Sequence, residues 1–199
     1  MMMNNTAIMI LAAGAASRIG SPKQLLNYQG KTLLRRIVDV ALESFKSQQI
    51  MVVLGASHEA VLQTIKETDV LHCLNKDWER GMASSIRSGL TNLLNTNPDL
   101  AQCFIALCDQ PHVHNHLFQE MKALSDSSSK GIVASEYAKT LGVPALFSNN
   151  YFNHLLALTG EQGAKKIILQ NLNDVATIKF EQGAVDIDTK SDYTKLTKH

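Results

Sequence analysis

The chain has 199 residues, which is enough for one substantial hydrophobic core and marginal for two. Hydrophobic residues make up 45% of it, charged residues 19%, and the net charge is +1, which gives no broad electrostatic basis for binding nucleic acid or a membrane surface. The segment Met1–Thr6 has no basic n-region, no apolar run is long enough to span a bilayer, and the three cysteines contain no Cys-x-x-Cys pair. We therefore expect a cytoplasmic protein with reduced thiols.

Apolar runs alternate with helical patterns along the chain. Residues 7–13 form a continuous apolar run that ends at Gly14, which predicts a strand buried on both faces. Thr32 can cap a helix that runs to about Phe45. Further strands are expected over residues 50–54, 69–74, 103–108, 131–135, 143–147, 175–180 and 184–187, and further helices over residues 57–65, 82–94, 113–124, 149–158 and 160–169. This alternation predicts one domain over residues 1–199, a three-layer α/β/α sandwich with a Rossmann-like, mostly parallel mixed sheet.

The loop from Gly14 to Lys23 follows the first expected strand, and in such sheets ligands bind outside the carboxyl ends of strands. It combines glycines and small residues with two cations, Arg18 and Lys23. Exposed amides in such a loop can hold phosphate oxygens, and the cations can neutralise them. The alternative is a turn with two solvated charges, and spacing alone does not separate the two interpretations.

Carboxylates follow two other expected strands. Asp109 comes directly after the apolar run 103–108, a position that suits a Mg²⁺ ligand, although an Asp before Pro111 could also cap a turn. Asp186 and Asp188 follow the last expected strand, where alternation would place both side chains on one face. That pair could complete a metal site with Asp109, or it could be a solvated strand end.

A fourth cluster lies between Asn75 and Ser85 and contains the only tryptophan, Trp78. Gly81 with Ser84 and Ser85 at a helix start offers amides and hydroxyls to a substrate. The alternative is helix capping together with packing of Trp78.

Six ordered blocks resemble those of a known family. The first, from Leu11-Ala12-Ala13-Gly14 through Ser17-Arg18 to Gly30-Lys31, resembles the opening signature of nucleotidyltransferases with the nucleotide-diphospho-sugar transferase fold. The others resemble the molybdenum cofactor cytidylyltransferase branch, and they are Asn75–Ser85, Leu107–Pro111, Gly142–Pro144, Gly160–Ala164 and Asp186–Thr189.

The resemblance implies transfer of CMP from CTP to the phosphate of molybdopterin, the organic part of the molybdenum cofactor, with release of pyrophosphate and with Mg²⁺ as cofactor. It implies catalytic roles for Arg18, Lys23 and Asp109, and metal binding by Asp109 and Asp188. The implied nucleotide-binding residues are Leu11, Ala12, Ala13, Gly14, Ser17, Arg18, Lys23, Ser84 and Asp109. The implied substrate-binding residues are Asn75, Gly81, Ser85, Gly142 and Asp186.

Other interpretations remain open at this point. Ala12-Ala13-Gly14 is similar to the cytosine-selecting form of the first motif, but another nucleotide, or another acceptor such as a sugar or polyol phosphate, would suit the same fold. A molybdoenzyme that receives the cofactor is a further possible partner. The chain could also be a non-catalytic molybdenum cofactor carrier, which would bind without turnover.

Overall fold

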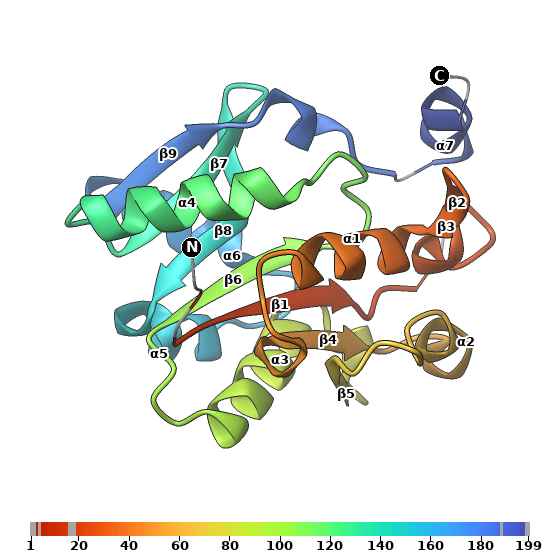
Figure 1. Cartoon of the computed structure of the whole chain (residues 1–199), viewed down its shortest axis with the longest axis horizontal. Helices are drawn as coiled ribbons and strands as arrows, with labels where there is room; N and C mark the ends of the chain where they lie inside the picture. The colour runs from red at the N-terminus through yellow and green to blue at the C-terminus, as the bar shows by residue number, and fades with distance from the viewer. Residues whose placement is uncertain (1–2, 4, 16–18, 188, 198–199) are drawn as a thin grey trace.

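The computed structural model describes residues 3, 5–15, 19–187 and 189–197. Within these residues, seven strands form one mixed sheet in the order β5-β4-β1-β6-β8-β7-β9, and β2 and β3 form a separate hairpin (Figure 1). Strand β8 runs antiparallel to both of its neighbours, and every other pair in the large sheet is parallel. The predicted α/β fold with a mostly parallel mixed sheet is confirmed.

The elements follow the predicted alternation. The strands are β1 (Thr6–Ala12), β2 (Asn27–Tyr28), β3 (Lys31–Thr32), β4 (Ile50–Leu54), β5 (Leu71–Leu74), β6 (Gln102–Leu107), β7 (Ile132–Tyr137), β8 (Thr140–Ser148) and β9 (Val175–Lys179). The helices are α1 (Leu33–Leu42), α2 (His58–Gln63), α3 (Met82–Thr96), α4 (Asn115–Ser127), α5 (Phe152–Leu156), α6 (Ala164–Gln170) and α7 (Lys190–Thr197).

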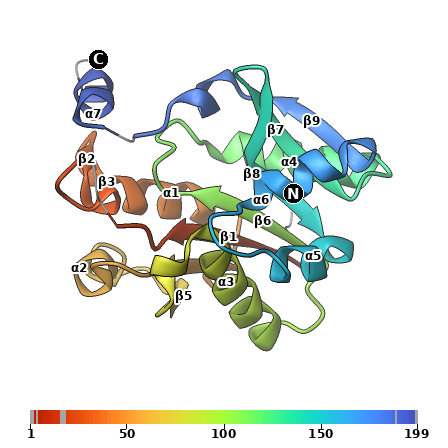
Figure 2. The same ribbon diagram turned by 180° about the vertical axis from the view of Figure 1, so that it is seen from behind.

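Helices cover both faces of the sheet, so alternate side chains of β1 enter two different cores. Ile8 and Ile10 belong to the core that also contains buried side chains of α1 and α4. Met9 and Leu11 belong to the core on the other face, which α3, α5 and α6 cover (Figures 1 and 2). The expected strand buried on both faces is therefore confirmed.

Local capping sets the start of α1. The Thr32 side chain accepts a hydrogen bond from the Arg35 amide at 3.2 Å, as the sequence predicts. Helix α7 packs near this start, since Ile187 and Leu196 share a small third core with Leu33 and two residues of the preceding loop, Ile19 and Leu26. This core joins the C-terminal segment to the region that follows the first loop.

The strand expected over residues 184–187 is absent. A 3₁₀ turn covers Glu181–Ala184, and the chain then continues without regular structure to Ile187. The apolar residue Ile187 is fully buried in the third core and does not lie in a sheet. The alternation argument that placed Asp186 and Asp188 on one face of a strand is therefore wrong in its premise.

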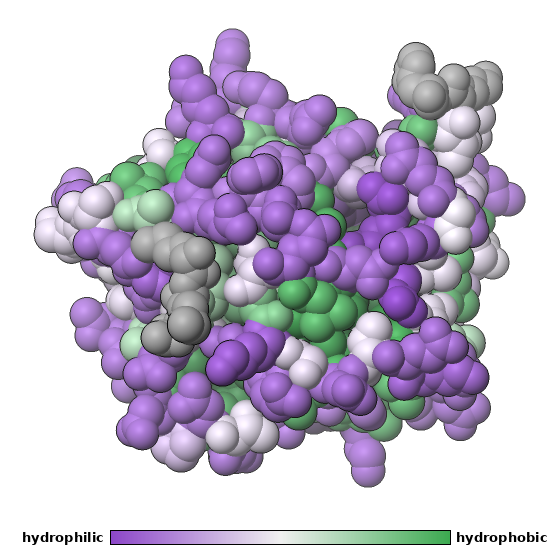
Figure 3. Space-filling model, viewed as in Figure 1, coloured by the Kyte–Doolittle hydropathy of each residue, from purple (hydrophilic) through white to green (hydrophobic). Residues whose placement is uncertain are grey.

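The face that α1 and α4 cover is mostly hydrophilic, with a smaller apolar area near its centre (Figure 3). No helix among the described residues is long and apolar enough to cross a membrane.

Candidate functional site

A cavity of about 440 Å³ lies at the carboxyl ends of β1 and β6. These neighbouring parallel strands end at the same edge of the sheet, with Leu11 opposite Leu107. The lining residues are Leu11, Ala12, Ala13, Gly14, Ala15, Lys23, Gln24, Trp78, Glu79, Gly81, Met82, Ser85, Leu107, Cys108, Asp109 and Glu161. The structure thus brings together the start of the first loop, the end of β6 and part of the Asn75–Ser85 block.

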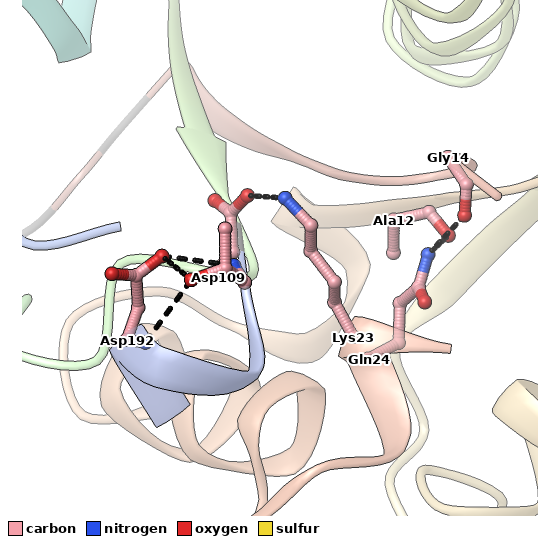
Figure 4. Close-up of polar contacts among 7 residues, drawn as sticks. Ala12, Gly14, Lys23, Gln24, Asp109 and Asp192 are labelled. Carbon is pink, nitrogen blue, oxygen red and sulfur yellow. Dashed lines mark hydrogen bonds and ion pairs between the residues drawn. The ribbon is translucent and has the colours of Figure 1, made fainter. Parts of the chain in front are cut away.

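Lys23 and Asp109 meet inside this cavity (Figure 4). The Lys23 Nζ atom donates to the Asp109 Oδ2 atom at 3.3 Å, and the two side chains are 23% and 19% exposed. Lys23 begins a 3₁₀ turn over Lys23–Leu25, and Asp109 follows β6 by two residues. A cation and a carboxylate that are 86 residues apart in the chain therefore share one partly buried site.

The surroundings of Asp109 disfavour its charged form. Burial raises the pKa of its carboxyl, the Lys23 ammonium opposes that rise, and the negative charge of Asp186 adds to it. The second oxygen, Oδ1, is buried and has no hydrogen-bond partner among the described residues. A bound cation would satisfy an oxygen of this kind.

The Gln24 side chain binds the backbone at the start of the first loop, which is the loop from Gly14 to Lys23. Its Nε2 atom donates to the carbonyl oxygens of Ala12 and Gly14, each at 2.8 Å, and its side chain is buried (Figure 4). These two bonds fix the backbone on either side of Ala13. The sequence does not single out Gln24, because a bond between a side chain and a carbonyl that is ten or more residues away leaves no local pattern.

The residues after β4 brace the same loop. The Ala56 amide donates to the Ala13 carbonyl oxygen at 3.1 Å. Gly55 lies so close to the loop that an added Cβ would stand 2.5 Å from that oxygen and 2.8 Å from the Trp78 Cβ atom. Glycine is required here by the close approach of two backbones.

The Asn75–Ser85 block divides between the cavity and a buried network. Gly81 and Ser85 line the cavity. Asn75 and Ser84 do not, because Asn75 Nδ2 donates to the Ser84 and Ser85 hydroxyls at 2.8 and 3.1 Å, and Ser84 Oγ lies within hydrogen-bond distance of the Asp77 and Gly81 carbonyls. Ser84 thus has structural contacts within the block, but it does not cap α3, whose N-cap is Gly81 without a side-chain hydrogen bond, and binding by Asn75 or Ser84 stays a prediction.

The remaining predicted residues lie elsewhere or outside the described part of the chain. Gly142 lies in β8 beside Tyr137 and does not line the cavity. Asp186 is exposed and close enough to Asp109 to affect its pKa. Ser17, Arg18 and Asp188 lie outside the described residues, so the roles predicted for them stay predictions.

Cys108 is the nucleophile that the cavity could offer beside Asp109. Its side chain is 7% exposed, and burial raises the pKa of its thiol far above the ordinary value. A protonated thiol is a poor nucleophile, so the site is not built for covalent catalysis by Cys108.

Comparison with known proteins assigns the chain to a family. Residues 8–175 match the MobA-like NTP transferase domain. The chain belongs to the MobA-like NTP transferase family. It is therefore a nucleotidyltransferase, and the cavity at the ends of β1 and β6 lies where a sheet of this type binds its ligand.

Individual relatives of this MobA-like chain carry different names. It is 28% identical to the nicotine blue oxidoreductase of Paenarthrobacter nicotinovorans, over 94% of each chain. It is 23% identical to a probable molybdenum cofactor guanylyltransferase of Bacillus cytotoxicus, over 98% of this chain and 97% of the relative.

A solved structure covers nearly the whole chain. Rv0371c from Mycobacterium tuberculosis superimposes with a TM-score of 0.81 and 30% identity, over 98% of this chain and 97% of that one. A structure of Rv0371c in complex with manganese superimposes with a TM-score of 0.77 and 27% identity, over 97% and 98% of the two chains.

Proposed function

We propose that this MobA-like chain acts as one domain over residues 1–199 and transfers CMP from CTP to the phosphate of molybdopterin, with release of pyrophosphate. The observation that carries the proposal is the contact between Lys23 and Asp109 in the cavity beside Ala12, Ala13 and Gly14. It unites a phosphate-neutralising cation and a carboxylate at one sheet edge. Such a reaction in the cytoplasm would supply the completed cofactor to a molybdoenzyme.

The chain's own groups are suited to position and charge stabilisation. In the reaction, an oxygen of the acceptor phosphate attacks the α-phosphorus of CTP, and the bond from that phosphorus to the bridging oxygen breaks as pyrophosphate leaves. Phosphoryl-type transfer needs little covalent help, and in-line positioning with charge stabilisation supplies most of the rate. Lys23, with Arg18, would offset the triphosphate charge, and the backbone that Gln24 holds would present amides to its oxygens.

The donor set fits a divalent cation. Asp109 offers a buried, unpartnered Oδ1 atom, and Asp186 lies near it, with Asp188 as the other proposed carboxylate. No group of three or more His, Cys, Asp or Glu side chains converges among the described residues, so phosphate oxygens and water would complete the ligands, as Mg²⁺ usually accepts. When bound, the cation would neutralise charge on the triphosphate and on the departing pyrophosphate. The manganese complex of Rv0371c supports a divalent metal in general.

The choice of CTP rests on the first loop. Ala12-Ala13-Gly14 resembles the cytosine-selecting form of the motif, and all three residues line the cavity. The relative named guanylyltransferase favours GTP as a second candidate. Both candidates share the acceptor and the leaving group, so a nucleotide series separates them.

The decisive experiment measures pyrophosphate release with molybdopterin, Mg²⁺ and each of CTP, GTP, ATP and UTP. We expect release with CTP, and loss of at least about 100-fold in Asp109→Asn and Lys23→Ala, the scale seen when charge-stabilising groups are removed. Asp39→Asn and Lys31→Ala are matched controls, since these two residues form an ion pair outside the cavity with the Lys31 side chain 55% exposed. Controls that lose as much activity as the site variants would contradict the proposal.

The same assay separates the other functions. Release with GTP alone would make the chain a guanylyltransferase, and release only with a sugar or polyol phosphate would change the acceptor. Binding of molybdopterin without turnover of any nucleotide would make it a carrier, and Asp109→Asn would then leave that binding intact.

A further inference from the structure

The side chain of Gln110 joins the end of β6 to two distant segments. It follows Asp109 directly and is only 4% exposed. Its Nε2 atom donates to the carbonyl oxygen of Val143 at 3.0 Å and to that of Gly183 at 3.1 Å, across 33 and 73 residues of sequence. One buried amide group therefore connects the Asp109 loop to β8 and to the 3₁₀ turn Glu181–Ala184.

The Gly183 contact matters because that turn leads to Asp186. Gly183 lies three residues before Asp186, and its own amide donates to the Phe180 carbonyl at 2.8 Å, so the turn is closed on itself. After Ala184 the chain has no regular structure until Ile187, which is anchored in the third core. The Asp186 segment is thus held at Gly183 on one side and at Ile187 on the other.

Tyr137 also donates a hydrogen bond to the Val143 carbonyl oxygen, but no hydrogen bond described here joins it to the turn Glu181–Ala184. Its hydroxyl donates to Val143 O at 3.0 Å. Its ring packs against Gly183 closely enough that an added Cβ there would stand 2.6 Å from the Tyr137 Cδ1 atom. Of the hydrogen bonds described here, the one from Gln110 is the link between the Asp109 loop and the turn that leads to Asp186.

Gln110 carries an energetic cost that supports a role for its side chain beyond packing. The Gln110 Oε1 atom is buried and has no hydrogen-bond partner among the described residues. An unpaired buried acceptor destabilises a fold, so an apolar side chain of the same size would suit the position better if only packing mattered. The donor on the other arm of the amide is what an apolar side chain cannot supply.

We infer that Gln110 is a positioning residue that fixes the Asp186 segment against Asp109, and so sets the spacing of the carboxylates available to a divalent cation. The inference rests on the proposed function. Mg²⁺ demands near-ideal geometry, whereas Ca²⁺ accepts variable ligand number and distance. Loss of the Gln110 link should therefore weaken Mg²⁺ more than Ca²⁺, a change of selectivity that a general loss of packing would not produce.

The test measures metal binding and does not need turnover. Free Mn²⁺ is followed by electron paramagnetic resonance in the presence of CTP, and Mg²⁺ and Ca²⁺ are titrated as competitors. In Gln110→Met, which keeps the volume and removes both donors, we expect Mg²⁺ affinity to fall about 10-fold or more, the usual effect of losing a group that orients metal ligands, with a smaller fall for Ca²⁺. Gln102→Met is the matched control, because this glutamine lies at the other end of β6, where its Nε2 atom donates to the Ser125 hydroxyl at 2.8 Å, and the variant should stay within about twofold of wild type.

The outcomes separate this inference from the function on which it rests. Wild-type protein that binds no Mn²⁺ with any nucleotide would overturn both. Wild-type protein that binds Mn²⁺, together with a ratio of Mg²⁺ to Ca²⁺ affinity in Gln110→Met that is unchanged from wild type, would overturn this inference alone. If Gln110→Met does not fold, Gly183→Ala moves the same turn while Gln110 stays in place, because the new Cβ would stand 2.6 Å from both Phe180 and Tyr137 ring atoms. Unchanged Mg²⁺ selectivity in a folded Gly183→Ala would then overturn it.

Discussion

Replacement of Gly55 by alanine should disturb the first loop from a distance. The added Cβ would stand 2.5 Å from the Ala13 carbonyl oxygen, 2.8 Å from the Ala13 Cβ and 2.8 Å from the Trp78 Cβ. None of these atoms is the end of a flexible side chain, so the loop or Trp78 must move. Overpacking of this kind costs about 1–3 kcal/mol.

Two further terms set the size of the effect. Movement of the Ala13 carbonyl weakens its 3.1 Å hydrogen bond from Ala56, which is worth about 1 kcal/mol. Alanine regains about 0.4–1 kcal/mol by restricting the unfolded chain. The free energy of unfolding should therefore fall by about 1–3.5 kcal/mol, and Tm by about 2–14 °C for a chain of this length.

Thermal unfolding and nucleotide binding test the reasoning together. Trp78 is the chain's only tryptophan and lines the cavity, so its fluorescence reports CTP binding directly. We expect Gly55→Ala to weaken CTP binding and to lower Tm. Gly14→Ala is the control for stability, since a Cβ there meets nothing within 4 Å and Tm should hardly change. A Gly55→Ala protein with wild-type Tm and wild-type CTP affinity would refute the close packing on which this account depends.

Three further predictions follow from charges. Burial raises the pKa of Asp109, so its ionised form lowers the stability of the fold at neutral pH. Asp109→Asn should therefore have the same Tm as wild type or a higher one at pH 7, and no advantage in Tm in acid, where the wild-type carboxyl is protonated. A large drop in the Tm of Asp109→Asn at pH 7 would contradict this. For the same reason metal-dependent activity should begin to fall on the acid side at a higher pH than an unburied aspartate would give, as a pH–rate profile would show. The pKa of Asp174 is shifted in the opposite direction, since hydrogen bonds from Tyr151 Oη at 2.7 Å and the Gly131 amide at 3.0 Å hold it below the ordinary value. Asp174→Ala should cost about 1–3 kcal/mol at pH 7 by denaturant titration, and the difference from wild type should shrink as pH falls through that lowered pKa; a constant difference down to strong acid would exclude the charge as its source.

Much of the fold could be predicted because each signal was local. The unbroken apolar run before Gly14 predicts a strand with both faces buried, and β1 sends alternate side chains into two cores. Thr32 predicts the start of α1 through the bond that it makes to Arg35. The position of Asp109 at the end of an apolar run was also enough to place it at the carboxyl edge of the sheet.

The parts that were missed depend on contacts between distant residues. Gln24 and Gln110 hold the site through carbonyl oxygens up to 73 residues away, and no pattern along the chain carries that information. The apolar residue Ile187 was interpreted as part of a strand, but it is buried because α7 packs on the hairpin region. An apolar residue in a short segment shows that it is buried, without showing which core receives it.

We propose that the cavity in which Lys23 meets Asp109 performs metal-dependent nucleotidyl transfer. The most direct test is pyrophosphate release from CTP by the wild-type chain with molybdopterin and Mg²⁺, compared with Asp109→Asn under the same conditions. We expect release that requires both substrates and the metal, with a loss of at least about 100-fold in the variant. Release by Asp109→Asn at the wild-type rate, or none by the wild type with any nucleotide and acceptor phosphate, would contradict it.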